Sequence, residues 1–270
     1  MRSERFRLGG IAVGSLVIVL ALLYAPLVQL IVSSVNANSL TTRWEGFTTR
    51  WYRAAFADDV VTAAMWRSLR LAVLVAVTSG LVGTSAAIAV RHRPRMRALV
   101  RGLATARVAT PEIVLAVALG VLFPLLGVRF GSWTMWFGHS ALLSAYVVLI
   151  VAARLAGQSP NLEDAAADLG ARPFAVVRHV VLPHAAPAVG VATLLVAAFS
   201  FDDVLLSSRL SGPQDTTLPL VIVSMATRRT TPELDAIGSL VIAAGLSVFA
   251  VAALIGRVAR SRERGEGLPL

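Results

Sequence analysis

Six long apolar segments constrain this sequence more than any other feature. A helix that crosses a bilayer needs about 20 mostly apolar residues, and in lipid the backbone must satisfy its own hydrogen bonds. The sequence therefore predicts an all-α polytopic membrane protein, folded as a single transmembrane domain over residues 1–270. The six predicted transmembrane helices are about 9–34, 68–90, 104–127, 139–157, 187–206 and 236–256.

The composition agrees with a membrane protein. Hydrophobic residues make up 56% of the chain and the mean hydropathy is +0.74, whereas soluble domains are about 45–50% apolar. The formal net charge is +10, and every basic residue is an arginine. Because no basic motif with interleaved aromatic residues occurs, we attribute this charge to membrane topology and predict no nucleic-acid partner. The chain has no cysteine, which excludes disulfides and thiolate catalysis.

The distribution of arginine orients the predicted helices. Basic residues collect in short cytoplasmic loops, and the densest cluster is RHRPRMR at 91–97. With this cluster inside, both termini and residues 158–186 are cytoplasmic, and the tail 257–270 is expected to be flexible. The apolar run from Leu8 to Val35 is about twice as long as the apolar core of a cleaved signal peptide. We therefore expect an uncleaved first transmembrane helix.

Each of the two long outer segments is expected to contain a short helix. Residues 36–66 are rich in tryptophan and tyrosine, which favour the headgroup level, so part of this segment should lie along the outer surface. Residues 207–235 contain an apolar stretch from Leu218 to Ala226. This stretch is too short to span a bilayer, so it predicts a short helix on the outer face.

The cytoplasmic loop 158–186 reads as a helix, a glycine corner and a second helix. Ser159 and Pro160 form a typical helix start, and Gly170 is a typical stop. A second helix is expected from Pro173, with Pro183 and Pro187 ending it. One apolar face of the first helix is predicted by i, i+3, i+4, i+7 spacing; it comprises Leu162, Ala165, Ala166 and Leu169. This helical hairpin either packs on its own bundle or docks a cytoplasmic partner.

The same loop resembles a pattern in ABC importer permeases, written E-A-A-x3-G-x9-I-x-L-P. Asp164, Ala165 and Ala166 match its start, and Gly170 follows at the same spacing. Val180, Leu182 and Pro183 match its end. Asp164 replaces the usual glutamate, with Glu163 just before it, and Val180 replaces isoleucine. The resemblance implies that this loop inserts into a groove of an ATPase subunit. The coupling residues that it implies are Glu163, Asp164, Ala165, Ala166, Gly170, Leu182 and Pro183.

Further stretches of the chain resemble the spermidine/putrescine-type branch of these permeases. They are GFTTRWYRAAFAD (46–58), PEIVLAVALGVLF (111–123), SFDDVLLS (200–207) and TTLPLVIVSM (216–225). The resemblance implies a bacterial inner-membrane protein that works with two ATPase subunits, a second related permease and an extracytoplasmic substrate-binding protein. The implied substrate is a polyamine. Relatives in this branch also carry iron or phosphonate compounds, which stay open as alternatives.

No catalytic site is predicted in this chain. A P-loop ATPase needs a lysine that reaches the terminal phosphates, and the chain has none. ATP and Mg²⁺ are therefore expected on the partner ATPase, and this chain is expected to hold no cofactor. The four histidines, His92, His139, His179 and His184, show no metal-ligand spacing. We expect no metal site and assign these histidines structural or solvated roles.

Three acidic residues fall within or at the end of predicted transmembrane helices. Ionisable groups at membrane depth usually line a pathway or pair with another charge. Glu112 follows Pro111 and either lines the substrate pathway or pairs with Arg107 or another buried arginine. Asp202 and Asp203 either bind a cationic substrate, or cap the helix end or bind the short outer helix.

The main alternative hypothesis is that the chain is a self-contained channel or a secondary transporter. In that reading residues 158–186 would be an ordinary connecting loop. Secondary transporters often contain inverted repeats, and the sequence shows none.

Overall fold

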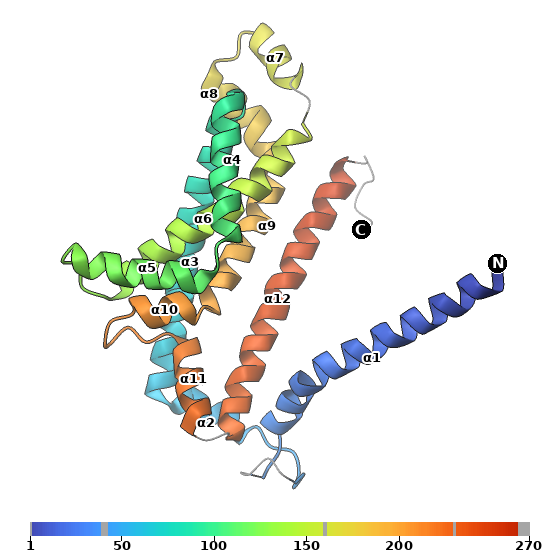
Figure 1. Ribbon diagram of the computed structural model, residues 1–270, viewed down its shortest axis with the longest axis vertical. Helices are drawn as coiled ribbons and strands as arrows, with labels where there is room; N and C mark the ends of the chain where they lie inside the picture. The colour runs from blue at the N-terminus through green and yellow to red at the C-terminus, as the bar shows by residue number, and fades with distance from the viewer. Residues whose placement is uncertain (1, 39–42, 159–160, 229–230, 264–270) are drawn as a thin grey trace. The chain divides into compact units, whose positions relative to one another are not determined.

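The computed structural model describes residues 2–38, 43–158, 161–228 and 231–263, and within these ranges the chain is helical without a strand. The long helices are α1 (Arg2–Ser34), α3 (Asp59–Ala89), α6 (Ser132–Ala156), α9 (Leu182–Phe201) and α12 (Pro232–Glu263). The shorter ones are α2 (Arg50–Ala57), α4 (Pro94–Ala109), α5 (Glu112–Leu125), α7 (Asn161–Asp168), α8 (Pro173–Val176), the π-helical turn η1 (Val177–Val181), α10 (Leu205–Leu210) and α11 (Leu218–Arg228) (Figure 1).

Five helical segments are long and apolar enough to cross a membrane, and α4 with α5 forms a sixth if this bent pair counts as one. Both short helices expected in the outer segments are also present as helices, namely α2 and α11. The predicted helical class and the approximate number of transmembrane helices are therefore confirmed.

The third predicted transmembrane helix, 104–127, is not straight, which corrects the sequence reading. Helix α4 ends at Ala109, α5 begins at Glu112, and the two axes meet at 99°. Pro111 has no N–H to donate, and a residue before proline disfavours the helical region. Thr110 accordingly takes an extended conformation with φ −76° and ψ 128°. The chain turns at this point instead of crossing as one rod.

The fifth predicted transmembrane helix begins earlier than expected, because Pro183 and Pro187 do not end the helix. Helices α8, η1 and α9 form one apolar segment from Pro173 to Phe201. The π-helical turn η1 ends at Val181, two residues before Pro183, and the N–H of Leu182 donates to the carbonyl of Val177. This wider turn changes the hydrogen-bond register just before Pro183, which has no N–H to donate, and the helix continues through it.

The tail 257–270 also differs from the expectation over part of its length. Helix α12 continues to Glu263, so residues 257–263 are helical, and residues 264–270 lie outside the described part. The predicted helix start at Ser159 and Pro160 lies outside it as well.

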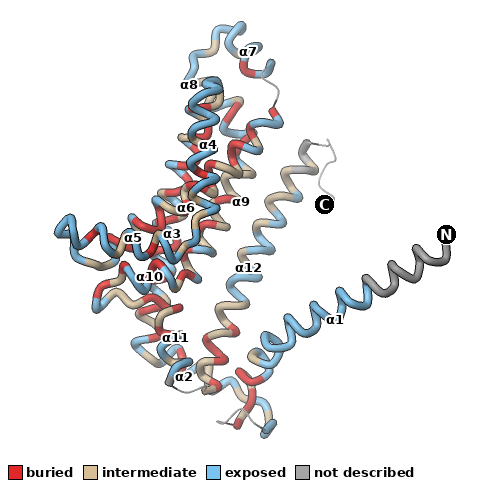
Figure 2. Tube along the Cα trace, in the orientation of Figure 1, coloured by how far each residue is buried: buried red, intermediate tan, exposed pale blue. Residues whose placement is uncertain are grey.

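The chain divides into two compact units. Unit 1 comprises 1–62 and 222–243, and it contains α1 and the first part of α12. A hydrogen-bonded chain joins its helices: the Tyr52 hydroxyl of α2 lies 2.7 Å from Ser34 Oγ and 2.8 Å from Ser239 Oγ. The apolar side chains of α1 are mostly exposed (Figure 2). Lipid or a partner subunit must cover them.

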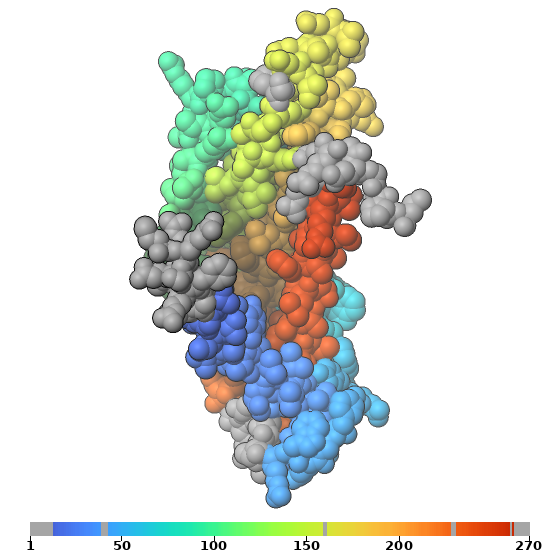
Figure 3. All heavy atoms as spheres, turned by 90° about the vertical axis from the view of Figure 1, so that its right-hand side faces the viewer, coloured from blue at the N-terminus to red at the C-terminus, as the bar shows by residue number. Residues whose placement is uncertain are grey.

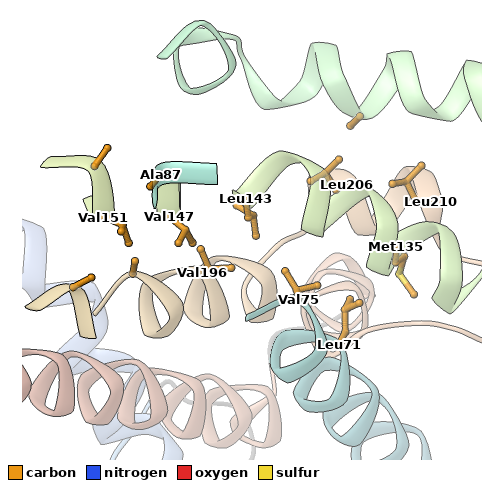
Figure 4. Packing of buried hydrophobic residues seen from close by; sticks show 14 of the residues in the cluster. Leu71, Val75, Ala87, Met135, Leu143, Val147, Val151, Val196, Leu206 and Leu210 are labelled. Atoms are coloured by element: carbon orange, nitrogen blue, oxygen red, sulfur yellow. The ribbon is translucent and has the colours of Figure 1, made fainter. Parts of the chain in front are cut away.

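Unit 2 comprises 63–221 and 244–270 and holds the largest apolar core. Helix α6 packs against α4, α9 and α10. Leu143, Val147 and Val151 of α6 point toward Val196 of α9 (Figure 4). The hairpin α7–α8 forms one end of this unit, as Figures 1 and 3 both show.

Two glycines of α3 permit close packing in this core. A Cβ atom at Gly83 would lie 2.6 Å from Val147 Cβ and 2.9 Å from the Ser144 carbonyl oxygen. A Cβ at Gly80 would lie 2.6 Å from the Thr193 methyl group. Small residues let membrane helices approach closely, and the structure shows which neighbours these two glycines meet.

We predict that Gly83→Ala destabilises the protein by about 1–3 kcal/mol, because the new methyl group meets backbone that cannot rotate away. Gly102→Ala in α4 is the matched control, since a Cβ there meets nothing within 4 Å. This control should be neutral or stabilising by up to about 1 kcal/mol. Thermal unfolding of both variants in detergent measures the difference, and equal midpoints would contradict the close packing.

Candidate functional site

The glycine corner of the hairpin forms as the sequence predicted. The N–H of Gly170 donates to the carbonyl of Ala167 at 2.8 Å, and that of Ala171 donates to Ala166 at 3.0 Å. This pair of bonds is a Schellman motif, which ends a helix with a left-handed residue. Gly170 has φ +85°, a conformation that costs other residues about 1–2 kcal/mol. The turn between α7 and α8 therefore depends on glycine.

The predicted apolar face of α7 points outward. Leu162 is 57% exposed and Leu169 is 90% exposed, and Ala165 is exposed beside them. At the start of α8, Phe174 is 74% exposed. Apolar side chains that project together from one end of a unit mark an interaction surface. The hairpin therefore does not use this face to pack on its own bundle.

The buried residue of α7 is an acid. Glu163 is 7% exposed, and its Oε1 lies 2.7 Å from Arg91 Nη2. Its Oε2 lies 2.8 Å from His92 Nε2. Glu163 Oε1 accepts no well-aligned hydrogen bond from Arg91. The contact between the two groups is therefore mainly electrostatic. Asp164 on the same helix is exposed.

The remaining implied coupling residues, Leu182 and Pro183, lie at the start of α9. Leu182 is 42% exposed, and both residues follow the π-helical turn. The helix is continuous from α8 into α9, so the hairpin is joined rigidly to a segment long enough to span a membrane.

The three acidic residues singled out in the sequence come from two places that the fold brings together. Glu112 begins α5, and Asp203 follows α9. The two carboxyl groups are close enough for their charges to interact. Arg107 forms no direct ion pair with Glu112 in the described part of the chain, although its charge also acts on Glu112. Glu112 therefore lies within the electrostatic reach of Asp203, Arg107 and His139.

Asp203 has the geometry of a helix cap. Its Oδ1 accepts a hydrogen bond from Leu206 N at 3.2 Å, and its Oδ2 accepts one from Ser207 N at 2.7 Å. These two N–H groups belong to the first turn of α10. Asp203 is 8% exposed, whereas Asp202 is exposed. The two neighbouring acids are therefore not equivalent.

His139 completes the buried network around Asp203. Its Nε2 lies 3.4 Å from Asp203 Oδ2, and its Nδ1 lies 3.0 Å from Ser200 Oγ. The ring is fully buried in α6. No local pattern indicates this contact, because His139 is 64 residues from Asp203 in the chain. The same holds for Arg91 and Glu163, which only the tertiary fold pairs.

The described residues contain no group of three or more His, Asp or Glu side chains arranged to hold a metal ion. The region offers three carboxylates in different surroundings: Asp202 is exposed, Glu112 is half-buried, and Asp203 is buried and caps α10. Such an arrangement attracts cations, and the oligoamines among them carry several ammonium groups.

Comparison with known families matches residues 79–264 to the binding-protein-dependent transport system inner membrane component. The chain is 37% identical to the spermidine/putrescine transport system permease protein PotC of Escherichia coli K12 over 245 residues, which are 90% of this chain and 93% of that protein. It is 34% identical to the putrescine transport system permease protein PotI of the same strain, covering 90% and 89% of the two chains.

Solved structures show a similar fold. A bacterial ABC transporter involved in the import of the acidic polysaccharide alginate matches with a TM-score of 0.64 at 17% identity, covering 95% of this chain and 98% of that one. The MetNI methionine ABC transporter in inward-facing conformations matches with a TM-score of 0.60 at 16% identity, covering 75% and 95%.

We predict that Asp203→Ala destabilises the protein by about 1–3 kcal/mol, because two backbone N–H groups and a buried histidine lose their acceptor. Asp202→Ala removes an exposed side chain of the same type and should leave stability within about 0.5 kcal/mol. Thermal unfolding in detergent compares the two variants. Equal losses at both positions would contradict the capping role of Asp203.

Proposed function

This chain belongs to the family of binding-protein-dependent transport system inner membrane components, and from that premise we propose that it is the polyamine-conducting permease subunit of an ATP-driven importer. The observation that carries the proposal is the similarity to PotC over 90% of this chain. A match of that extent covers the transmembrane helices, the hairpin and the acidic residues together. We propose spermidine or putrescine as the substrate.

The motor is expected on a separate polypeptide. This chain has no lysine and hence no P-loop, so a partner ATPase must bind ATP and Mg²⁺. We propose that two ATPase subunits, a second homologous permease and an extracytoplasmic binding protein complete the importer. Both termini and the hairpin would then face the cytoplasm, in agreement with the arginine distribution.

The hairpin α7–α8 is the proposed docking element for the ATPase. Its outward face carries Leu162, Leu169 and Phe174 at more than half exposure, which supports burial against a partner. Ala165 and Ala166 permit close approach beside them. The continuous helix from Pro173 to Phe201 would carry the motion of the docked hairpin to the membrane. A connecting loop without a partner would leave this apolar face in water.

The proposed pathway contact for the polyamine includes Asp202 and Glu112. Asp202 is exposed and Glu112 is partly exposed, so both could meet an ammonium group. Asp203 is engaged by α10 and His139 and would act by placing its neighbours. An acidic site suits a polyamine better than it suits a phosphonate anion, because like charges repel.

The test is reconstitution of this chain in proteoliposomes with the permease, ATPase and binding protein encoded beside it. ATP-dependent uptake of radiolabelled putrescine and spermidine is the expected result. Asp202→Asn should lower this uptake about tenfold, since a charged hydrogen bond is lost, while Asp202→Glu keeps the charge and most of the uptake. Failure of any ATPase to co-purify would reject the importer assignment, and uptake of another solute alone would reject the polyamine.

We also predict that Gly170→Val uncouples the complex. The backbone at this position has φ +85°, which a β-branched residue adopts at a cost of more than about 1 kcal/mol, so the hairpin would be displaced. Gly170→Asn is the matched control, because asparagine tolerates this conformation. Polyamine uptake per ATP hydrolysed should fall for valine and stay near normal for asparagine. Equal coupling in the two variants would show that the glycine corner is dispensable.

A further inference from the structure

The junction between the hairpin and the rest of unit 2 is built around one buried ion pair. Arg91 and Glu163 have side chains that are 10% and 9% exposed, and their charged atoms lie 2.7 Å apart. Arg91 also donates from Nη1 to Gln158 Oε1 at 2.8 Å. His92, which is 66% exposed, is a second and more solvated partner of Glu163.

Arg91 meets two neighbouring segments, around Gln158 and Glu163, that are distant from it in the sequence. Arg91 itself lies between the end of α3 and the start of α4, and Gln158 follows the end of α6. Glu163 lies in the first turn of α7. One guanidinium group therefore ties the first helix of the hairpin to the α3–α4 corner and to the end of α6. The covalent chain provides no such link to α3 and α4.

The orientation of Glu163 separates it from the docking face. The exposed apolar residue Leu162 lies on the same short helix and Leu169 directly follows it, but the Glu163 carboxylate is buried against Arg91. A carboxylate held in this way is not available to a partner surface. The family resemblance placed Glu163 among the residues that contact the ATPase, whereas the geometry points inward.

Two routes can then carry a displacement of α7–α8 into the membrane helices. One is the continuous helix through η1 into α9. The other is the Arg91–Glu163 ion pair, which leads into α3 and α4. A buried pair resists separation, because removing either charge leaves the other without compensation in a region of low dielectric.

We propose that Glu163 and Arg91 are positioning residues that transmit the motion of the ATPase-docked hairpin to the α3–α4 corner. This inference rests on the proposed importer function, and it assigns Glu163 to transmission instead of docking. With the ion pair broken, the ATPase still docks on the apolar face and hydrolyses ATP, but α3 and α4 no longer follow the hairpin.

The test uses the complete reconstituted complex with Glu163→Gln, Arg91→Gln and the double variant. Each single variant should retain the ATPase at normal stoichiometry and lower polyamine uptake per ATP hydrolysed by about two- to thirtyfold. The double variant should be no worse than either single one, because the two residues act as a pair. Asp168→Asn, an exposed acid on the same helix, is the control and should leave the ratio unchanged.

Each alternative has its own signature. Loss of the ATPase from the Glu163→Gln complex would make Glu163 a docking contact, and multiplied effects in the double variant would make the two residues independent. Both results overturn the proposal, as does an unchanged uptake per ATP. A merely structural role would lower thermal stability and ATP hydrolysis along with uptake, without a change in their ratio. Failure of the proposed function itself is distinct, because the unaltered complex would then show no ATP-dependent uptake.

Discussion

The backbone of a chain in lipid must satisfy its hydrogen bonds internally, and the rest of this structure follows from how its prolines meet that constraint. Proline cannot donate, so each one inside an apolar segment forces a local solution. At Pro111 the helix stops and the chain turns by 99°. At Pro183 the π-helical turn η1 shifts the hydrogen-bond register beforehand, and the helix continues. Proline thus ends a helix at position 111 but lies within a continuous helix at position 183.

These two outcomes determine where the polar groups lie. The corner at Pro111 places Glu112 at the start of α5, within electrostatic reach of Asp203 after α9. The continuous helix through Pro183 joins the hairpin directly to α9. A break at Pro183 would have separated the outward apolar face of α7 from the membrane helices. The acidic residues and the hairpin are therefore connected through α9, which carries one at each end.

The buried acids of unit 2 each lie beside a basic side chain. Glu163 and Asp203 are buried acids in unit 2. Glu163 pairs with Arg91, and Asp203 lies beside His139. Their sequence neighbours Asp164 and Asp202 are exposed. Desolvating a carboxylate without a partner is expensive, so the acid that packs inward is the one that finds a partner. This leaves the adjacent acid free for a ligand or another subunit.

The sequence by itself determined the helical class, the approximate transmembrane segments and the hairpin with its stop at Gly170, because apolar length, proline and glycine act locally. It also indicated the family, through the spacing of residues in the loop 158–186. It did not reveal that Pro183 sits inside a helix, that α7 turns its apolar face outward, or that Arg91 pairs with Glu163 and His139 with Asp203. The two pairings join residues that are 72 and 64 positions apart in the chain. Only packing decides which of two neighbouring acids is buried, because burial depends on a partner supplied by another segment.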